Sequence, residues 1–410
     1  METNNASSDP VRQGRAGEVF ATFLRLGLTC FGGPIAHLGY FRREFVERRR
    51  WLDEETFIDL VGLCQFLPGP ASSQVGFSIG LLRAGWLGGL AAWCGFTLPS
   101  VLLLLAFAAI APSLGGPIGG GLIHGLKLVA VAVVAQAVWD MARRLCSDKR
   151  RVAIALIAVA LLGSLTTLYA QLIVIGIGAV LGLILCRTAS SDAVRLPQIN
   201  HDFRVSRRVG AIALLLFCVL LFGLPALIEI DPGRSIKVFD AFYRSGALVF
   251  GGGHVVLPLL QQQTVATGWI SSSSFLAGYG AAQAVPGPLF TFAAYLGWIL
   301  TGAPNHWTGA LLATVGIFLP GLLLVLAALP YWQSLRDRPS MSALLAGVNA
   351  AVVGLLAAAL YSPVWTSAVL SELDFAIATI GFLLLTRWKA PPLAIVAFCA
   401  LAGMAETMLH

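Results

Sequence analysis

Apolar residues follow one another in long runs along this chain, and polar residues are collected in short connectors between them. Windows without a single Asp, Glu, Lys or Arg cover residues 84–123, 152–186, 209–228, 245–335 and 339–371. A helix needs only about 20 apolar residues to cross a bilayer, so the longer windows hold several helices each. The pattern predicts an all-α polytopic membrane protein embedded in a lipid bilayer.

We predict about 13 membrane-spanning segments, with six in each half of the chain and an unmatched segment between the halves. The segments are about 16–38, 56–81, 85–111, 118–141, 152–168 and 169–186, then 209–229, then 238–260, 272–300, 307–330, 341–362, 370–386 and 391–408. The chain thus divides into a polar tail (1–15), a first repeat (16–187), a basic cytoplasmic linker (188–208), a connecting helix (209–230) and a second repeat (231–410). The tail lacks the apolar core and cleavage site of a signal peptide.

Two polar motifs occur once in each half. Phe-x-Arg-x-Gly-x-x-x-Phe-Gly-Gly begins at Phe23 and again at Phe242, and Gln-x-x-Pro-Gly-Pro begins at Gln65 and again at Gln283. The offset between matched residues stays at 217 to 221, so one half duplicates the other. Equivalent spans are seven apart, and an odd separation places the halves upside down relative to each other. The sequence therefore predicts an inverted repeat with broken helices, as in secondary transporters.

The distribution of Lys and Arg bears on the orientation of the spans. If the N-terminus is cytoplasmic, 17 of these residues fall in cytoplasmic segments and seven in outer segments, in the direction that the positive-inside rule requires. Five of the outer seven lie in one connector, 42–50, and violate the rule. Either this connector forms an amphipathic helix on the membrane surface, or the first segment does not fully cross.

Composition supports a membrane protein and argues against two other classes. Hydrophobic residues make up 57% of the chain and charged residues 11%, against about 25% charged residues in soluble domains. The net charge of +7 is spread over short connectors, so no nucleic-acid interface is expected. The seven cysteines are scattered, and the histidines at 37, 124, 254 and 306 lack metal-ligand spacing. We expect no metal, no cofactor and no disulfide framework.

Only three basic residues fall inside the predicted spans: Arg25, Lys127 and Arg244. A charge at the bilayer centre costs about 2.5–3.5 kcal/mol on insertion scales, so it usually faces a partner or an aqueous cavity. Arg25 and Arg244 are equivalent positions, and inversion would bring both to one site near the midplane. Two guanidiniums suit a doubly charged tetrahedral oxyanion. The alternatives for Arg25 are snorkelling or a structural ion pair with Asp59 or Asp140.

Glycines and prolines interrupt the predicted spans at matched positions. The candidates for anion contact are Gly32 and Gly33 after Arg25, Gly251 and Gly252 after Arg244, and Gly69 and Gly287 inside the two Pro-Gly-Pro motifs. Such residues unwind helices within the membrane, and the helix N-termini so created attract anions. Gln65 and Gln283 precede the Pro-Gly-Pro motifs and could donate to the same anion. The alternatives are close helix packing for the glycines and interhelical hydrogen bonds for the glutamines.

The two halves differ in their remaining charges within the spans. Lys127, Asp59 and Asp140 of the first half correspond to Asn349, Ala277 and Ser362 in the second. Lys127 is a candidate third contact for the anion, with a pair to Asp140 or snorkelling as the alternative. Asp59 and Asp140 are candidates for carrying a coupled proton.

These motifs resemble the chromate ion transporter family in its long, two-domain form. The resemblance is carried by 31–34 (Phe-Gly-Gly-Pro), Trp51-Leu52, 65–70 (Gln-Phe-Leu-Pro-Gly-Pro), 250–254 (Phe-Gly-Gly-Gly-His) and 283–288 (Gln-Ala-Val-Pro-Gly-Pro). It covers nearly the whole chain, from about residue 18 to the end, and it implies an inner-membrane exporter of chromate from a prokaryote that confers chromate resistance. It also implies that the glycine- and proline-rich motifs lie in or near the transport path.

We therefore expect a secondary transporter that exports chromate, or a related sulfate-like oxyanion, by alternating access and is not an enzyme. Membrane potential would drive it, with or without proton exchange. The alternatives are a transporter or channel for sulfate or another oxyanion and, less favoured, a membrane-bound redox enzyme, which would need a redox centre that the cysteine pattern does not suggest. The sequence leaves the oligomeric state open, with a homodimer as one arrangement.

Overall fold

The computed structural model describes residues 14–114, 116–165, 170–186, 205–230, 233–332 and 339–409, and these ranges are helical without a strand. The first half contains α1 (Ala16–Thr29), α2 (Gly33–Phe41), η1 (Arg42–Arg48), α3 (Glu54–Phe66), α4 (Ala71–Ile110), η2 (Ala111–Ser113), α5 (Gly116–Leu145), α6 (Lys149–Ser164) and α7 (Ala170–Leu185), and α8 (Arg207–Ile230) follows. The second half contains α9 (Arg234–Ala247), η4 (Gly253–Val255), α10 (Val256–Thr264), α11 (Ser272–Ala284), η5 (Leu289–Thr291), α12 (Phe292–Trp298), α13 (His306–Ala328), η6 (Leu329–Tyr331), α15 (Pro339–Ala359), η7 (Leu360–Trp365), α16 (Thr366–Ala368), α17 (Glu372–Thr386) and α18 (Pro392–Leu409). The prediction of an all-α chain is confirmed. Residues 1–13 of the predicted tail, residue 187 of the predicted first repeat and 188–204 of the predicted linker lie outside the described residues.

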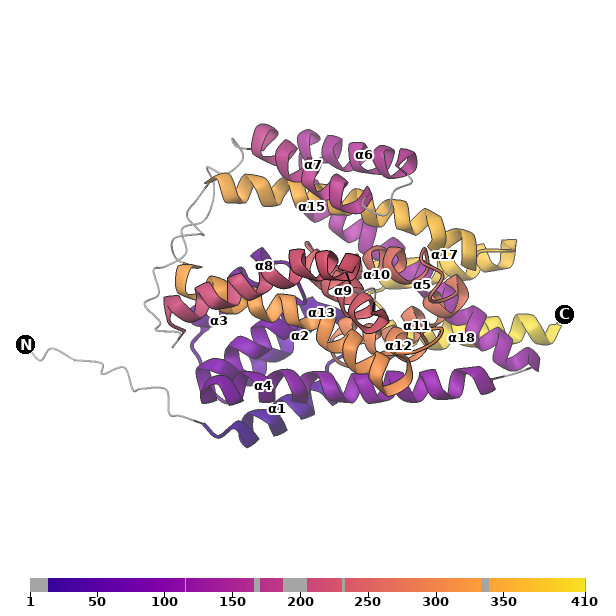
Figure 1. Cartoon of the computed structure of the whole chain (residues 1–410). Helices are drawn as coiled ribbons and strands as arrows, with labels where there is room; N and C mark the ends of the chain where they lie inside the picture. Colours follow the sequence, from indigo (N-terminus) through magenta and orange to yellow (C-terminus); the bar gives the residue numbers. More distant parts are fainter. Residues whose placement is uncertain are drawn as a thin grey trace, which may run out of the picture.

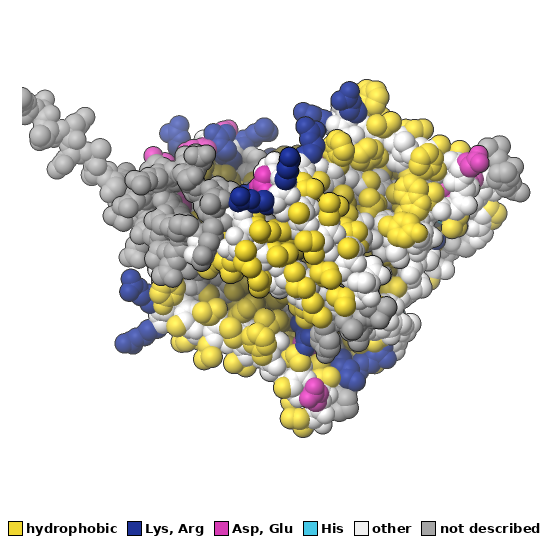
Figure 2. Space-filling model, turned by 90° about the horizontal axis from the view of Figure 1, so that it is seen from above, with side chains coloured by type: hydrophobic (Ala, Val, Ile, Leu, Met, Phe, Trp, Pro, Cys, Tyr) yellow, Lys and Arg dark blue, Asp and Glu magenta, His cyan; other side chains and the backbone are white. Residues whose placement is uncertain are grey.

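Five helices in the described ranges are long and apolar enough to cross a membrane: 71–113, 116–145, 207–230, 306–331 and 340–368. Helix length and composition therefore account for five of the 13 predicted spans. In α8 only 6% of the most apolar window is buried, and large side chains such as Phe222 and Leu215 point outward. Figure 2 shows a broad hydrophobic surface on which charged side chains are few. Such a surface is what contact with lipid requires.

The predicted spans 16–38, 56–81, 238–260 and 272–300 are each broken near the middle. The breaks cover residues 30–32, 67–70, 248–252 and 285–288. Gly32, Gly69, Gly251 and Gly287 have φ values of +100°, +119°, +76° and +98°, a backbone region that glycine adopts without steric cost. The breaks predicted from the glycine and proline motifs are confirmed.

The chain also reverses direction inside α4, where Ala84 and Gly85 have non-helical backbone angles. A Cβ on Gly80 would collide with the carbonyl of Gly88, although eight residues of straight helix would separate the two by about 12 Å. Residues 71–83 and 86–110 are therefore two antiparallel helices. Gly297 of α12 and Gly309 of α13 make the same mutual contact in the second half.

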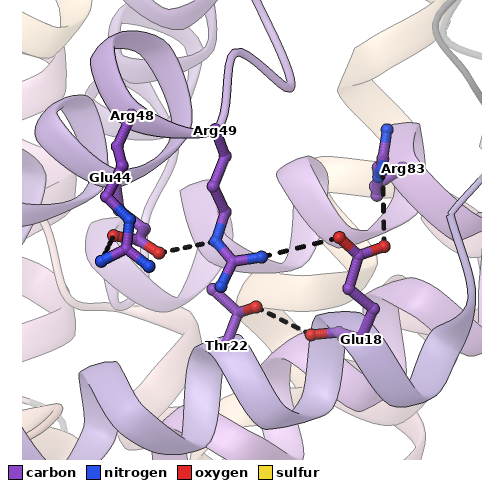
Figure 3. Close-up of polar contacts among 6 residues, drawn as sticks. All are labelled: Glu18, Thr22, Glu44, Arg48, Arg49 and Arg83. Carbon is purple, nitrogen blue, oxygen red and sulfur yellow. Dashed lines mark hydrogen bonds and ion pairs between the residues drawn. The ribbon is translucent and has the colours of Figure 1, made fainter.

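The free ends of the broken segments meet in each half. In the first, Arg49 lies 3.6 Å and Arg83 3.4 Å from Glu18 at the start of α1, as Figure 3 shows. Residues after α2 thus return to the end of the molecule where α1 begins. In the second half the side chain of Arg234, at the start of α9, donates to the Thr301 carbonyl, and the Thr301 N–H donates to the Trp269 carbonyl at 3.1 Å.

The last two helices of each half pack on the other half (Figure 1). α6 and α7 lie against α15, where Gly182 fits beside Gly347. α17 and α18 lie against α5, where Gly403 fits beside Gly121 and Gly125. Small residues allow this close backbone approach between helices. The two halves are therefore interlocked, with the four breaks between them.

Candidate functional site

The four breaks meet through two equivalent hydrogen bonds that cross between the halves. The Gly69 N–H donates to the Val249 carbonyl at 2.8 Å, and the Gly287 N–H donates to the Cys30 carbonyl at 2.8 Å. Each bond joins a Pro-Gly-Pro break of one half to the Gly-Gly break of the other. The predicted anion contacts Gly69 and Gly287 thus use their N–H groups to hold the breaks together.

The Gly-Gly breaks also touch each other. A Cβ on Gly253 would stand 3.4 Å from the Pro34 ring, so the start of α2 faces the start of η4. Gly32, Gly251 and Gly252 are exposed, although the repeat places them in the middle of predicted spans. The breaks therefore form one central region, and its backbone is accessible from outside the protein.

A helical segment begins after each of the four breaks without a side-chain cap. Gly32 precedes α2, Pro70 precedes α4, Gly252 precedes η4–α10 and Pro288 precedes η5–α12, and none of these four residues provides a side-chain acceptor. Elsewhere, Asp53 caps α3, Asp148 caps α6, Ser271 caps α11 and Ser371 caps α17, whereas α1, α9 and α13 begin without a side-chain cap. An uncapped helix start has N–H groups free for an anion, and the helix dipole favours negative charge there.

Gln283 supplies a further donor next to the break at 285–288. One helical turn before it on α11 lies Tyr279, whose hydroxyl is 2.7 Å from His254 Nδ1. The Nε2 of Gln283 is buried and has no hydrogen-bond partner. A buried donor without an acceptor costs free energy, which a bound anion would recover. Gln65, the equivalent of Gln283, is exposed instead.

Lys127 lies on α5 beside the broken helices. The carbonyl of the adjacent Leu126 packs so closely against Gly280 of α11 that a Cβ there would collide with it. Lys127 forms no ion pair at salt-bridge distance in the described ranges, and the carboxylate that acts on it electrostatically is Asp374. The equivalent of Lys127 in the second half is Asn349, which lies against Gly251. The Asn349 Oδ1 is 3.3 Å from the point where a Cβ on Gly251 would stand. The repeat therefore predicts that Lys127 faces the equivalent break at Gly32.

Arg25 and Arg244 have different surroundings. Arg25 is exposed and lines a pocket of about 160 Å³ with Arg43, Glu44 and Arg48. Arg244 is largely buried and its Nε lies 3.0 Å from Asp240 Oδ1. The described residues show no contact between the two arginines. A shared two-arginine site thus stays a prediction of the repeat.

The two candidates for proton coupling also differ. Asp59 is buried and accepts a hydrogen bond from Trp332 Nε1 at 2.9 Å, which ties α3 to the end of the α13 segment. Asp140 is half-buried on α5, and neither it nor Asp59 pairs with Arg25 within the described residues. The role of both in coupling stays a prediction.

Sequence reasoning missed several contacts of the central region. Ser100 donates to the Pro286 carbonyl, and Gln74 donates to the carbonyls of Pro68 and Gly321 at 3.0 Å each. It also missed a group with metal-ligand chemistry, formed by His124, Asp374 and Glu406. Asp374 already accepts from two backbone N–H groups and contacts His124, so its carboxylate has a structural role at the start of α17. The spacing of these three residues in the sequence gave no signal, because tertiary packing alone brings α5, α17 and α18 together.

Comparison with known proteins matches both halves to one family. The chromate transporter family matches residues 17–183 and again 236–404. The chain is 29% identical to the chromate transport protein of Pseudomonas aeruginosa over 83% of this chain and 79% of the other, and 28% identical to the probable chromate transport protein of Synechococcus elongatus over 93% of each.

A shorter relative corresponds to a single repeat. The uncharacterized transporter YwrA of Bacillus subtilis is 28% identical over 95% of its own length, which is 41% of this chain. No solved structure matches the chain. With the family motif present in each repeat and most of the chain covered, this protein belongs to the chromate transporter family.

Proposed function

We propose that this protein exports chromate from the cytoplasm across the inner membrane of a bacterium and so confers chromate resistance. Family membership supports a transporter with an oxyanion substrate. The observation that carries the proposal is the central region, where uncapped helix starts and the buried Nε2 of Gln283 lie at the breaks. The repeat predicts that the Lys127 ammonium faces the same region. These groups are donors or positive charges, and together they suit a dianion with four oxygens.

The arrangement of the broken segments supports a revised topology. We infer that each broken segment enters the membrane and returns to the same side, which leaves nine full crossings and four re-entrant hairpins. The connector 42–50 then lies on the side of the N-terminus, beside Glu18. On this topology 22 Lys and Arg residues fall on that side and two, Arg234 and Lys237, fall on the other. The violation of the positive-inside rule disappears.

The two halves retain an inverted relation in this topology. α1 and α9 then enter from opposite sides, and the break in each hairpin contacts the other half. Alternating access would follow from movement of one set of hairpins against the other around the central anion. A dianion that leaves a cell with a negative interior gains about 4.6 kcal/mol per 100 mV, so membrane potential alone can drive export.

Chromate uptake into inside-out vesicles tests the site. We expect Lys127→Gln to lower the initial rate of saturable uptake by at least about tenfold, the equivalent of about 1.4 kcal/mol of lost anion stabilisation, and Gln283→Leu to lower it by a smaller factor. Arg387→Gln, which removes a charge from an exposed connector, is the control and should leave uptake unchanged. Normal uptake by Lys127→Gln at equal protein levels would contradict the central site.

Two further variants distinguish this site from a shared arginine site. If Arg25 and Arg244 both bind the anion, Arg25→Gln and Arg244→Gln should each abolish saturable uptake, whereas the central site predicts that Arg25→Gln retains it. Competition by sulfate would identify the broader oxyanion alternative. Uptake that fails to saturate would favour a channel over a carrier.

Cysteine labelling tests the topology. In a cysteine-free background, Arg50→Cys and Gly268→Cys should react with an impermeant maleimide from opposite sides of the membrane, with position 50 on the cytoplasmic side. Labelling of both positions from one side would contradict four re-entrant hairpins.

A further inference from the structure

The connector after α2 forms a π-helix, η1 (Arg42–Arg48), in place of a continued α-helix. A π-turn closes bonds between residues five apart, and such turns occur frequently at functional sites. Three pairs at this spacing follow one another along η1. Arg42 lies 2.6 Å from Glu47, and Arg49 lies 2.6 Å from Glu44. The third pair, Arg43 with Arg48, has two positive charges, and both side chains line the same pocket.

The pocket has more positive charge than its own carboxylate neutralises. Arg25 of α1 adds a third guanidinium to Arg43 and Arg48, and Glu44 is the acidic residue of the lining. Glu44 is engaged by Arg48 at 3.2 Å and by Arg49 at 2.6 Å. In the described ranges neither Arg25 nor Arg43 has a carboxylate at salt-bridge distance. The volume of about 160 Å³ would hold about five waters, which is room for one tetrahedral oxyanion group.

Arg42, by contrast, is paired outside the pocket. Its Nε lies 2.7 Å from Glu54, and the Glu54 and Glu47 carboxylates raise the pKa of Arg42 above its ordinary value. Arg42 thus has two carboxylates on one side of the connector. On the pocket side, within the described ranges, Arg48 shares Glu44 with Arg49, and Arg43 has no carboxylate at salt-bridge distance. A phosphate between Arg43 and Arg48 would offset the like charges of these two lining residues.

The equivalent hairpin in the second half lacks the pocket chemistry. Residues 261–263, which correspond to 42–44, are three glutamines, and the residue that corresponds to Arg48 is uncharged. Arg244, the equivalent of Arg25, is paired with Asp240. The pocket is therefore a feature of the arginine-rich end of the molecule. That end would face the cytoplasmic leaflet, whose anionic lipids attract basic segments.

We propose that Arg25, Arg43 and Arg48 bind the phosphate group of an anionic phospholipid from the cytoplasmic leaflet. Arg25 lies on the outward face of α1 together with Leu28, which is 54% exposed, so an acyl chain can lie on this face while the phosphate enters the pocket. Guanidiniums bind phosphate through paired N–H donors. The bound lipid would hold α1 to η1 and so position the first hairpin. This site is separate from the central region.

Lipid binding by the purified, full-length protein tests the proposal. In neutral phosphatidylcholine, phosphatidylglycerol should bind to the wild type in native mass spectrometry and raise its melting temperature. We expect the Arg43→Gln/Arg48→Gln variant to bind phosphatidylglycerol at least about tenfold more weakly. The matched control, Arg42→Gln/Arg50→Gln, removes the same charge from the same connector and should change the affinity less than about twofold.

Three outcomes would overturn the proposal. Equal weakening in the two double variants would mean general attraction to a basic surface. Equal binding of phosphatidylcholine would mean that no phosphate site for anionic lipid exists. Displacement of phosphatidylglycerol by millimolar inorganic phosphate would assign the pocket to a free oxyanion.

If the pocket variant does not fold in neutral lipid, Thr29→Glu, which places a carboxylate at the pocket wall, should weaken binding in the same way.

Discussion

Two hairpins occupy equivalent positions in the repeat, α1 with α2 and α9 with α10. They have the same structure at their centres and different contacts at their ends. At the centre both have a Gly-Gly break, and each break accepts a hydrogen bond from the Pro-Gly-Pro break of the other half. At the ends, Glu18, Glu44, Arg49 and Arg83 form an ionic network in the first half, drawn in Figure 3. In the second half, Trp269 and Thr301 are joined through backbone groups and Arg234 donates to a carbonyl.

This difference separates two kinds of constraint. The centre is fixed by backbone geometry, because only glycine adopts the required φ values and only a carbonyl from the other half completes the bonds. The ends are held by side chains, and the charge of these side chains can differ between the two aqueous faces of the membrane. Arginines gather at the end that we assign to the cytoplasm, and the other end is joined by hydrogen bonds to backbone carbonyls.

The largest expected effect comes from breaking the shared centre. Gly287→Ala places a Cβ against Ser100 Oγ at a φ of +98°, and strain of this kind costs about 1–3 kcal/mol before the collision is counted. We expect a lower melting temperature and loss of saturable chromate uptake in vesicles. Gly268→Ala is the matched control, because it has a φ of +74° and no neighbouring atom within 4 Å. Equal losses of melting temperature and of uptake in both variants would show that backbone strain, rather than the contact between the halves, causes the effect of Gly287→Ala.

A smaller effect is expected from the two equivalent arginines. Arg244→Gln leaves Asp240 largely buried without its partner, which should lower the free energy of unfolding by about 3 kcal/mol. Arg25→Gln removes an exposed charge and should change it by less than about 0.5 kcal/mol. Urea unfolding in detergent measures both. Adding Asp240→Asn to Arg244→Gln should recover most of the loss, and no recovery would mean that Arg244 stabilises the fold through other contacts.

The smallest effect is expected at the ionic end of the first hairpin. Glu18→Gln removes the charge opposite Arg49 and Arg83, but Glu18 is 39% exposed, so the loss should be about 0.5–1 kcal/mol. High salt should reduce the difference between variant and wild type because it screens exposed pairs. Lys237→Gln, at the equivalent position in the second half, should have no measurable effect. A loss that is independent of salt would indicate that Glu18 acts through packing.

Some features that we first found in the structure had a signal in the sequence. Asp240 precedes Arg244 by four residues, the spacing of a helical ion pair, and the first half has Ala21 at the equivalent position. The repeat offset is 219 at Gly32 and 218 at Trp51, so the first half has one extra residue between them. A single inserted residue is what turns a helix into a π-helix, and η1 lies in that interval.

The sequence alone determined the membrane class, the duplication and the positions of the breaks, because apolar run length and the backbone limits of glycine and proline are local properties. Tertiary structure decided what those features do. It directed the broken segments back beside their own starting ends, paired Gly69 with Val249 and Gly287 with Cys30, and packed the last helices of each half on the other. It also placed Arg25 in the lining of a pocket and Arg244 in an ion pair, although the two arginines occupy equivalent positions in the repeat. Contacts between residues far apart in the chain depend on packing, which local patterns do not encode.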